Sequence, residues 1–169
     1  MKHNIIKRST INLFAATGVI LLLQACSHQP DYKAARDQVI NLHDKLMDDD
    51  GLAVNDKLKL KSLATPAALQ NLKTAQPQTD TVVEKTHITS MIKHLDSVSN
   101  AMSDWMNQFE PDVQGKSDQQ AADYFKAEKL KVNRLDSSYK VVLKTSDAYL
   151  AKFHIKADSA KAQPMKMKM

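Results

Sequence analysis

Residues 80–110 read DTVVEKTHITSMIKHLDSVSNAMSDWMNQFE, and this stretch decides the fold. Its apolar side chains recur at intervals of three and four residues, which is the spacing of one face of an α-helix. Thr79 or Asp80 is expected to cap the start of this helix, and the helix should end before Pro111. The predicted core stripe comprises Ile88, Met91, Leu95, Val98, Met102, Trp105 and Phe109.

A second apolar stripe follows a polar loop that contains Gly115. Ser117 should cap this helix, which is expected to run to about Ile155. Glu128 and Ser146 are polar interruptions in an otherwise regular heptad spacing. The apolar positions are Ala121, Phe125, Val132, Leu135, Tyr139, Val142, Tyr149 and Phe153.

A third stripe lies upstream and begins at Tyr32. Three acids meet a glycine at residues 48–51, so we expect a break, kink or frayed turn there. Thr65 and Pro66 then supply a cap and a first residue for a short helix through Thr74. The apolar positions of the third stripe are Ala35, Val39, Leu42, Leu46, Ala53, Leu60 and Leu63.

These three stripes predict an all-α fold. Long amphipathic helices joined by short loops bury their apolar faces most simply as an antiparallel up-down-up bundle. We therefore expect a bundle domain over residues 32–156, built from three long helices with a short extra helix. The Lys- and Met-rich tail at 157–169 lacks periodicity and is expected to be disordered.

The N-terminus has the pattern of a secretory signal peptide. Lys2, Lys7 and Arg8 precede an apolar run from Ile11 to Leu23, and no acid occurs there. This run is about 13 residues long, whereas a membrane-spanning helix needs roughly 20. We therefore expect residues 1–25 to be removed from the mature chain.

The residues Leu23-Gln24-Ala25-Cys26 resemble the lipobox of bacterial lipoproteins. The resemblance implies cleavage between Ala25 and Cys26, a diacylglycerol on the Cys26 thiol and an acyl chain on the new amine. Residues 26–31 would then be a lipidated tether. Ser27 follows the cysteine where an Asp would retain a lipoprotein in the inner membrane, so we expect an outer-membrane location. No acidic run follows Cys26, which favours a domain facing the periplasm over surface display. The alternative is an ordinary secreted protein with an unmodified cysteine.

Short motifs in the body resemble a group of small helical bacterial lipoproteins labelled "viral A-type inclusion protein". The motifs are His43-Asp44 with Met47, then residues 102–106, MSDWM, with Phe109. The resemblance implies a helical fold and carries no reaction, cofactor or substrate.

Composition and motifs favour a non-catalytic binding or scaffold role. The chain has 24 basic and 19 acidic residues, and removal of the three basic residues in 1–25 leaves 21 against 19. Basic and acidic residues alternate, so we expect no nucleic-acid partner. No phosphate-binding loop, nucleophile elbow or metalloprotease motif occurs, so we expect no enzyme activity. The expected partners are therefore the membrane, which the chain would contact through its lipid anchor, and other proteins of the cell envelope.

Histidines and methionines at helical spacing suggest a different function, binding of copper or haem in the periplasm. Imidazole and thioether ligands suit copper(I) or haem iron, and Met165, Met167 and Met169 would add thioethers from the tail. If the first two long helices are antiparallel, His43 should lie level with Met102 or its neighbours. The structural alternative is that the methionines pack in the core and the histidines lie at the surface without binding a ligand. The candidate ligands are His43, Met47, Met102, His87, Met91 and His94.

Two further groups have a competing structural interpretation. The acids at 48–50 could bind calcium, but a solvated acidic turn is the simpler interpretation because the EF-hand spacing is missing. Trp105 and Phe109 could stack on a ligand, but both fit core positions four residues apart.

Overall fold

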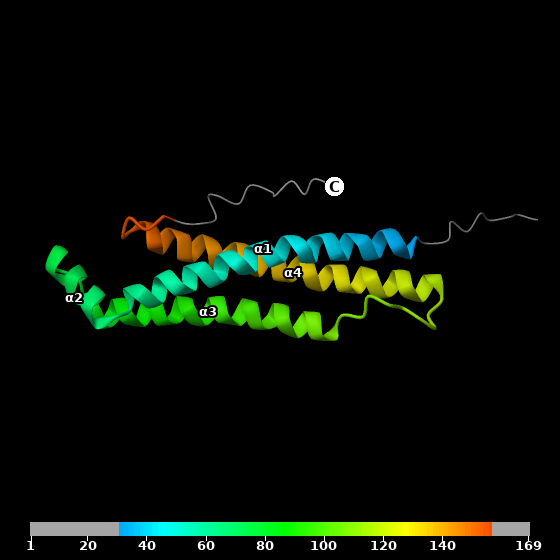
Figure 1. The fold of residues 1–169 in the computed structure, drawn as a ribbon, viewed down its shortest axis with the longest axis horizontal. Helices are drawn as coiled ribbons and strands as arrows, with labels where there is room; N and C mark the ends of the chain where they lie inside the picture. The colour runs from blue at the N-terminus through cyan, green and yellow to red at the C-terminus, as the bar shows by residue number, and fades with distance from the viewer. Residues whose placement is uncertain (1–30, 157–169) are drawn as a thin grey trace, which may run out of the picture.

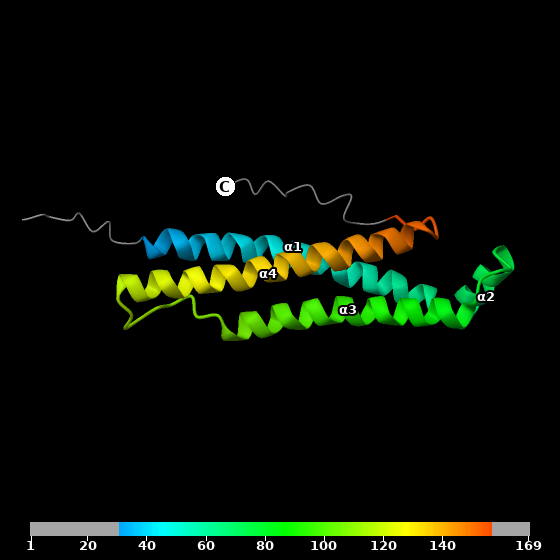
Figure 2. The same cartoon turned by 180° about the vertical axis from the view of Figure 1, so that it is seen from behind.

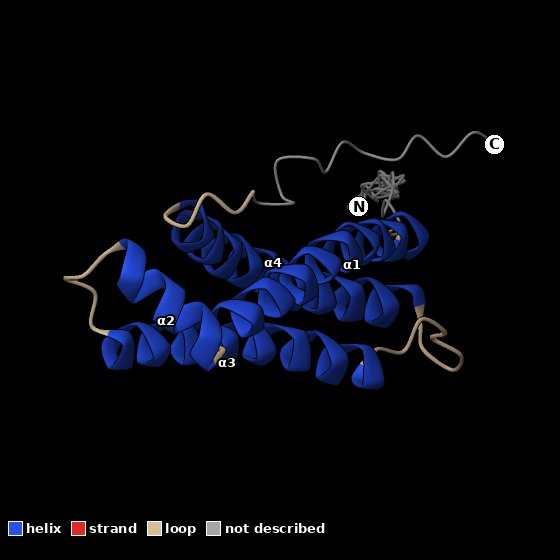
Figure 3. Ribbon diagram, turned by 60° about the vertical axis from the view of Figure 1, so that its left-hand side comes forward, coloured by secondary structure: helices blue, strands red, loops and turns tan. Residues whose placement is uncertain are grey.

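The computed structural model describes residues 31–156, and this part of the chain is all-helical with no strand. Figures 1 and 3 show three long helices lying lengthwise and a short one at one end. The predicted signal peptide, Cys26 and the tail lie outside the described residues. The helices are α1 (Tyr32–Leu63), α2 (Pro66–Ala75), α3 (Thr81–Gln108) and α4 (Asp118–Ala151).

Side-chain caps define where the helices begin. Thr65, Asp80 and Ser117 each accept a hydrogen bond from a backbone N–H in the first turn of α2, α3 and α4, as predicted. Ser117 also forms a reciprocal capping box with Gln120. Asp31 caps α1 in the same way. The start of each helix is therefore determined by residues close in sequence and does not require tertiary contacts.

The break or frayed turn predicted at residues 48–51 is wrong, because α1 continues through this segment as a helix. Long-range hydrogen bonds hold Asp50 in its helical position. The Asp50 carboxylate accepts from the Tyr139 hydroxyl at 2.8 Å and from Ser99 Oγ at 2.5 Å. Asp49 accepts from Lys45 at 3.0 Å. The acids at 49 and 50 are therefore part of the helix packing and do not form a solvated turn.

The end of α4 also differs from the prediction. The helix ends at Ala151, whereas the apolar pattern suggested about Ile155. His154 adopts φ +58, and the Ile155 N–H bonds back to the Leu150 carbonyl at 3.2 Å. This turn satisfies a terminal helix carbonyl and still brings Phe153 and Ile155 against the core.

The predicted stripes form the core, with one shift along α4. Leu143 and Leu150 are buried there, whereas Leu135 and Val142 are only half-buried. In α3, Met91 and Phe109 are half-buried at the edge of the stripe. The buried apolar residues are Val39, Leu46, Ala53, Leu60, Leu69, Ile88, Leu95, Val98, Met102, Trp105, Ala121, Phe125, Val132, Tyr139, Leu143, Tyr149 and Leu150.

Three polar side chains are buried among these apolar residues. Ser146 Oγ donates to the Asp56 carboxylate at 2.5 Å, and Asp56 is 1% exposed. Trp105 Nε1 donates to Glu128 at 2.8 Å, and Lys131 pairs with the other oxygen of Glu128. Glu128 and Ser146, expected as interruptions of the stripe, are thus partners inside the core.

The hydrogen bonds between α1 and α4 keep a nearly constant offset in residue number. The offset is 91 for Gln38 with Lys129, 89 for Asp50 with Tyr139 and 90 for Asp56 with Ser146. The two helices lie side by side from the N-terminal half of α1 onward and diverge toward the end where α2 lies (Figures 1 and 2). Over its whole length α1 packs more extensively against α4 than against α3.

Burial of Asp56 should make stability depend on pH. Burial, reinforced by the nearby charge of Asp147, raises the pKa of Asp56 above its ordinary value, although the Ser146 hydrogen bond opposes this. The folded state therefore holds more protons than the unfolded chain above pH about 4, and the free energy of unfolding falls as pH rises through the folded pKa. We expect Asp56→Asn to gain stability relative to the parent chain between pH 4 and pH 7, measured by urea unfolding.

The matched control is Asp48→Asn, because Asp48 is exposed on the same helix. The difference in the free energy of unfolding between Asp48→Asn and the parent chain should stay nearly constant with pH. A pH-independent difference for Asp56→Asn would contradict the raised pKa.

Candidate functional site

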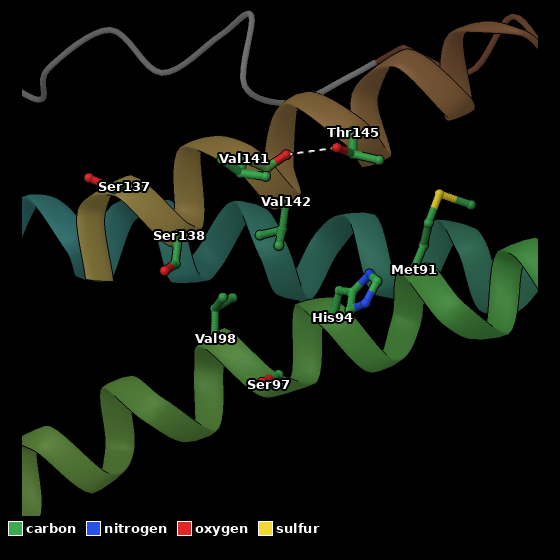
Figure 4. Close-up of a pocket in the computed structure, with 9 residues that line it drawn as sticks. All are labelled: Met91, His94, Ser97, Val98, Ser137, Ser138, Val141, Val142 and Thr145. Atoms are coloured by element: carbon green, nitrogen blue, oxygen red, sulfur yellow. Dashed lines mark hydrogen bonds between the residues drawn. The ribbon is translucent and has the colours of Figure 1, made fainter. Parts of the chain in front are cut away.

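A groove of about 510 Å³ lies between α3 and α4. Figure 4 shows α3 and α4 forming its two walls, with α1 behind them. Four lining residues come from α3 and five come from α4. They are Met91, His94, Ser97 and Val98, with Ser137, Ser138, Val141, Val142 and Thr145.

The lining of this α3–α4 groove offers aliphatic carbon and hydroxyl oxygen. The hydroxyls of Ser137, Ser138 and Thr145 donate to carbonyls one turn earlier in α4. Their donor capacity is therefore used within the helix, and only oxygen lone pairs remain for a ligand. Val141 is 65% exposed and Val98 is buried, so apolar surface runs from the rim to the floor. This surface is suited to bury apolar side chains.

The charge of the side chains differs between the two ends of the groove. One adjoining hollow shares Met91 and Val141 with the groove and includes Lys144 and Lys152. The hollow at the other end shares Ser138 and includes Lys131 and Arg134, together with Asp104. An elongated ligand in the groove would meet basic side chains at the Lys144 end. At the other end acids offset the basic side chains, because Lys131 pairs with Glu128 and Asp104 lines the same hollow.

A second cluster lies between α1 and α3. His43 Nδ1 is 3.0 Å from the Asp44 carboxylate, and His43 Nε2 is 3.4 Å from Sδ of Met106. The imidazole also lies against the indole of Trp105, with ring centroids 5.7 Å apart. His43 is partly buried, with 27% of its side chain exposed. We call His43, Asp44, Trp105 and Met106 the imidazole–thioether cluster.

The structure separates the predicted metal ligands. Met91 and His94 line the α3–α4 groove, whereas His43 lies on the α1–α3 side. His87 is exposed. Within residues 31–156, no group of three or more His, Cys, Asp or Glu side chains is arranged to hold a metal ion.

His43 lies close to its expected level on α3. We predicted that His43 would lie level with Met102 or one of its neighbours, and it contacts Met106, one turn further along α3. Met102 itself is buried in the core, and Met47 is 42% exposed. Trp105 is buried and stacks on Phe109 at 4.8 Å, which confirms its core position.

Sequence reasoning missed Met106 as a possible ligand and did not find the α4 wall of the groove. Met106 lies outside the core stripe, so only the pairing of α1 with α3 identifies it. Val141 could have been noticed as an apolar residue beside the stripe of α4, since a β-branched side chain gains little from an exposed helical position. Nothing in the sequence alone showed that a groove lies next to it.

No helix within residues 31–156 combines the length and hydropathy needed to cross a membrane. Comparison of the chain with models of protein families, with curated proteins and with solved structures finds no match.

Proposed function

We propose that this chain is a lipid-anchored envelope protein with a non-catalytic binding role, and that the α3–α4 groove is its binding face. The observation that carries the proposal is the groove itself, which exposes aliphatic side chains such as Val141 between two long helices. His94 is the titratable residue in its lining, and the rest is apolar or hydroxyl-bearing. Such a surface can bind by apolar burial without chemical change to the ligand.

The proposed framework is an antiparallel up-down-up bundle of the three long helices, with α2 as the short extra helix. The constant offset near 90 between α1 and α4 partners supports a parallel pair. Between α3 and α4 the residue numbers of partners rise on one helix as they fall on the other, as expected for antiparallel neighbours. These pairs are Glu84 with Tyr149, Val98 with Tyr139 and Trp105 with Glu128.

The proposed occupant of the groove is an acidic amphipathic helix of another envelope protein. A helix can place its apolar stripe in a groove between two helices. Lys144 and Lys152 at one end of the groove would attract acids that flank such a stripe.

The proposed anchor is the acylated Cys26, which the lipobox resemblance implies. Each buried methylene contributes about 0.8 kcal/mol, and two or three acyl chains hold a protein on a membrane where one chain is marginal. Ser27 supports sorting to the outer membrane, with the helical domain facing the periplasm.

The anchor is tested by Cys26→Ser. The parent chain should enter the detergent phase in a phase-partition experiment, whereas the variant should remain aqueous or keep its signal peptide because the acceptor thiol is absent. Cys26 is the chain's one cysteine, so no other thiol can substitute. Mass spectrometry that finds an unmodified Cys26 in the native protein would contradict the anchor.

The binding face is tested with two synthetic helical peptides that share a leucine stripe, one acidic and one basic. The full-length chain in detergent should bind the acidic peptide more tightly. Replacing Lys144 and Lys152 together by Glu should weaken binding about tenfold, since two surface charge contacts together contribute roughly 1.4 kcal/mol. Fluorescence anisotropy measures the affinities.

Position-matched controls separate the groove from the rest of the surface. Val141→Asp should abolish binding, and Leu58→Asp should leave it unchanged, because Leu58 is an exposed apolar residue on α1 outside the groove. Equal binding of both peptides, or equal effects of the two variants, would overturn the proposal. A dimer that Val141→Asp dissociates would assign the groove to a second copy of the chain instead.

A further inference from the structure

The imidazole–thioether cluster on the α1–α3 side places an imidazole nitrogen against a thioether sulfur. His43 Nε2 and Met106 Sδ are 3.4 Å apart, although the two residues are 63 positions apart in the sequence. Both side chains reach the surface, since Met106 is 38% exposed and the His43 side chain is 27% exposed. An ion from solvent can therefore reach the space beside both atoms.

The neighbouring carboxylate orients the imidazole as in a metal site. When Nδ1 of His43 donates its proton to Asp44, Nε2 presents a lone pair toward Met106. The thioether sulfur is itself only an acceptor. Two lone pairs then face each other, and a cation between them converts this arrangement into two coordinate bonds. A carboxylate on the second ring nitrogen is the usual support of a metal-binding histidine.

We propose that His43 and Met106 bind a copper(I) ion. Thioether sulfur is a soft ligand that selects copper(I) over hard cations. An ion about 2.0 Å from the nitrogen and about 2.3 Å from the sulfur, as in protein zinc sites, fits a separation of 3.4 Å with the two ligands at a bent angle. As axial ligands of a haem, the nitrogen and the sulfur would lie on opposite faces of the porphyrin, about 4.3 Å apart at the same bond lengths. The shorter observed separation therefore favours copper over haem.

The environment of the pair supports a monovalent cation. Asp44 adds a negative charge beside the imidazole. The indole of Trp105 lies next to the His43 ring, with the two ring centroids 5.7 Å apart. The ion would therefore lie between a carboxylate-supported imidazole and a thioether, close to the indole of Trp105.

Two further methionines are one helical turn from the ligand pair. Met47 follows His43 by four residues on α1, and Met102 precedes Met106 by four on α3, which places each on the same face as its neighbour. Met47 is 42% exposed and Met102 is 1% exposed. We assign Met47 as the third ligand of the copper ion, because its side chain is accessible, and leave Met102 in the core.

This copper site is separate from the α3–α4 groove and does not depend on the function proposed for the groove.

The chain contains one tryptophan, which makes the test specific for this location. Copper(I) should quench the fluorescence of Trp105 in the full-length chain in detergent, and so should silver(I), which is redox-inert. Competition with a colorimetric copper(I) chelator under anaerobic conditions gives the affinity. We expect His43→Ala and Met106→Leu each to weaken binding about tenfold or more, and Met47→Leu to weaken it less.

Matched controls use residues of the same kinds from elsewhere in the chain. Met91→Leu and His94→Ala, both in the groove, should leave affinity and quenching unchanged. Leucine at Met165, Met167 and Met169 should also leave them unchanged. Circular dichroism verifies that each variant is folded. If His43→Ala does not fold, Met106→Leu alone tests the site. Unquenched Trp105, parent-like affinity in Met106→Leu, or loss of binding in any control would overturn the proposal.

Discussion

The hydrogen bond from Ser146 to the buried carboxyl of Asp56 fixes how α1 lies against α4. A buried carboxyl without a partner is costly, so sliding α1 by one turn would be opposed by both Asp56 and Asp50, which accepts from Tyr139. Within residues 31–156, every buried side-chain nitrogen or oxygen has a hydrogen-bond partner. Apolar stripes alone would tolerate several alignments, whereas these polar pairs select one.

That alignment determines both surfaces to which we assign a role. With α1 held against α4, the groove between α3 and α4 remains open on the face away from α1 (Figure 4). The same alignment brings His43 beside Met106 on the other side of α3. A binding groove and a metal site can therefore use different faces of one long helix without sharing a side chain.

Local features of the fold were predictable from the sequence, and features that depend on helix pairing were not. The caps at Thr65, Asp80 and Ser117 act within one turn, so the sequence around them is sufficient. The predicted break near Asp50 failed because hydrogen bonds to α3 and α4 outweigh a poor local helix propensity. Glu128 was read as an interruption because its partner lies 23 residues away on another helix.

The candidate sites follow the same division. Helical spacing identified His43 and Met91 as residues worth considering, but it could not say that they face different helices. Met106 became a candidate only through its level on α3 opposite α1. The groove required knowledge of which face of the α3–α4 pair α1 leaves uncovered. Each of these facts is a relation between helices that no single periodic stripe contains.

Cysteine cross-linking of α1 to α4 tests the alignment most directly. The side-chain ends of Gln38 and Lys129 are hydrogen-bonded at 2.7 Å, so a short bis-maleimide reagent should join cysteines at these two positions within one chain in a Cys26→Ser background. Cysteines at 38 and 152, on opposite ends of the two helices, should not be joined by the same reagent. A cross-link between 38 and 152, with none between 38 and 129, would contradict the parallel alignment and with it the placement of both surfaces.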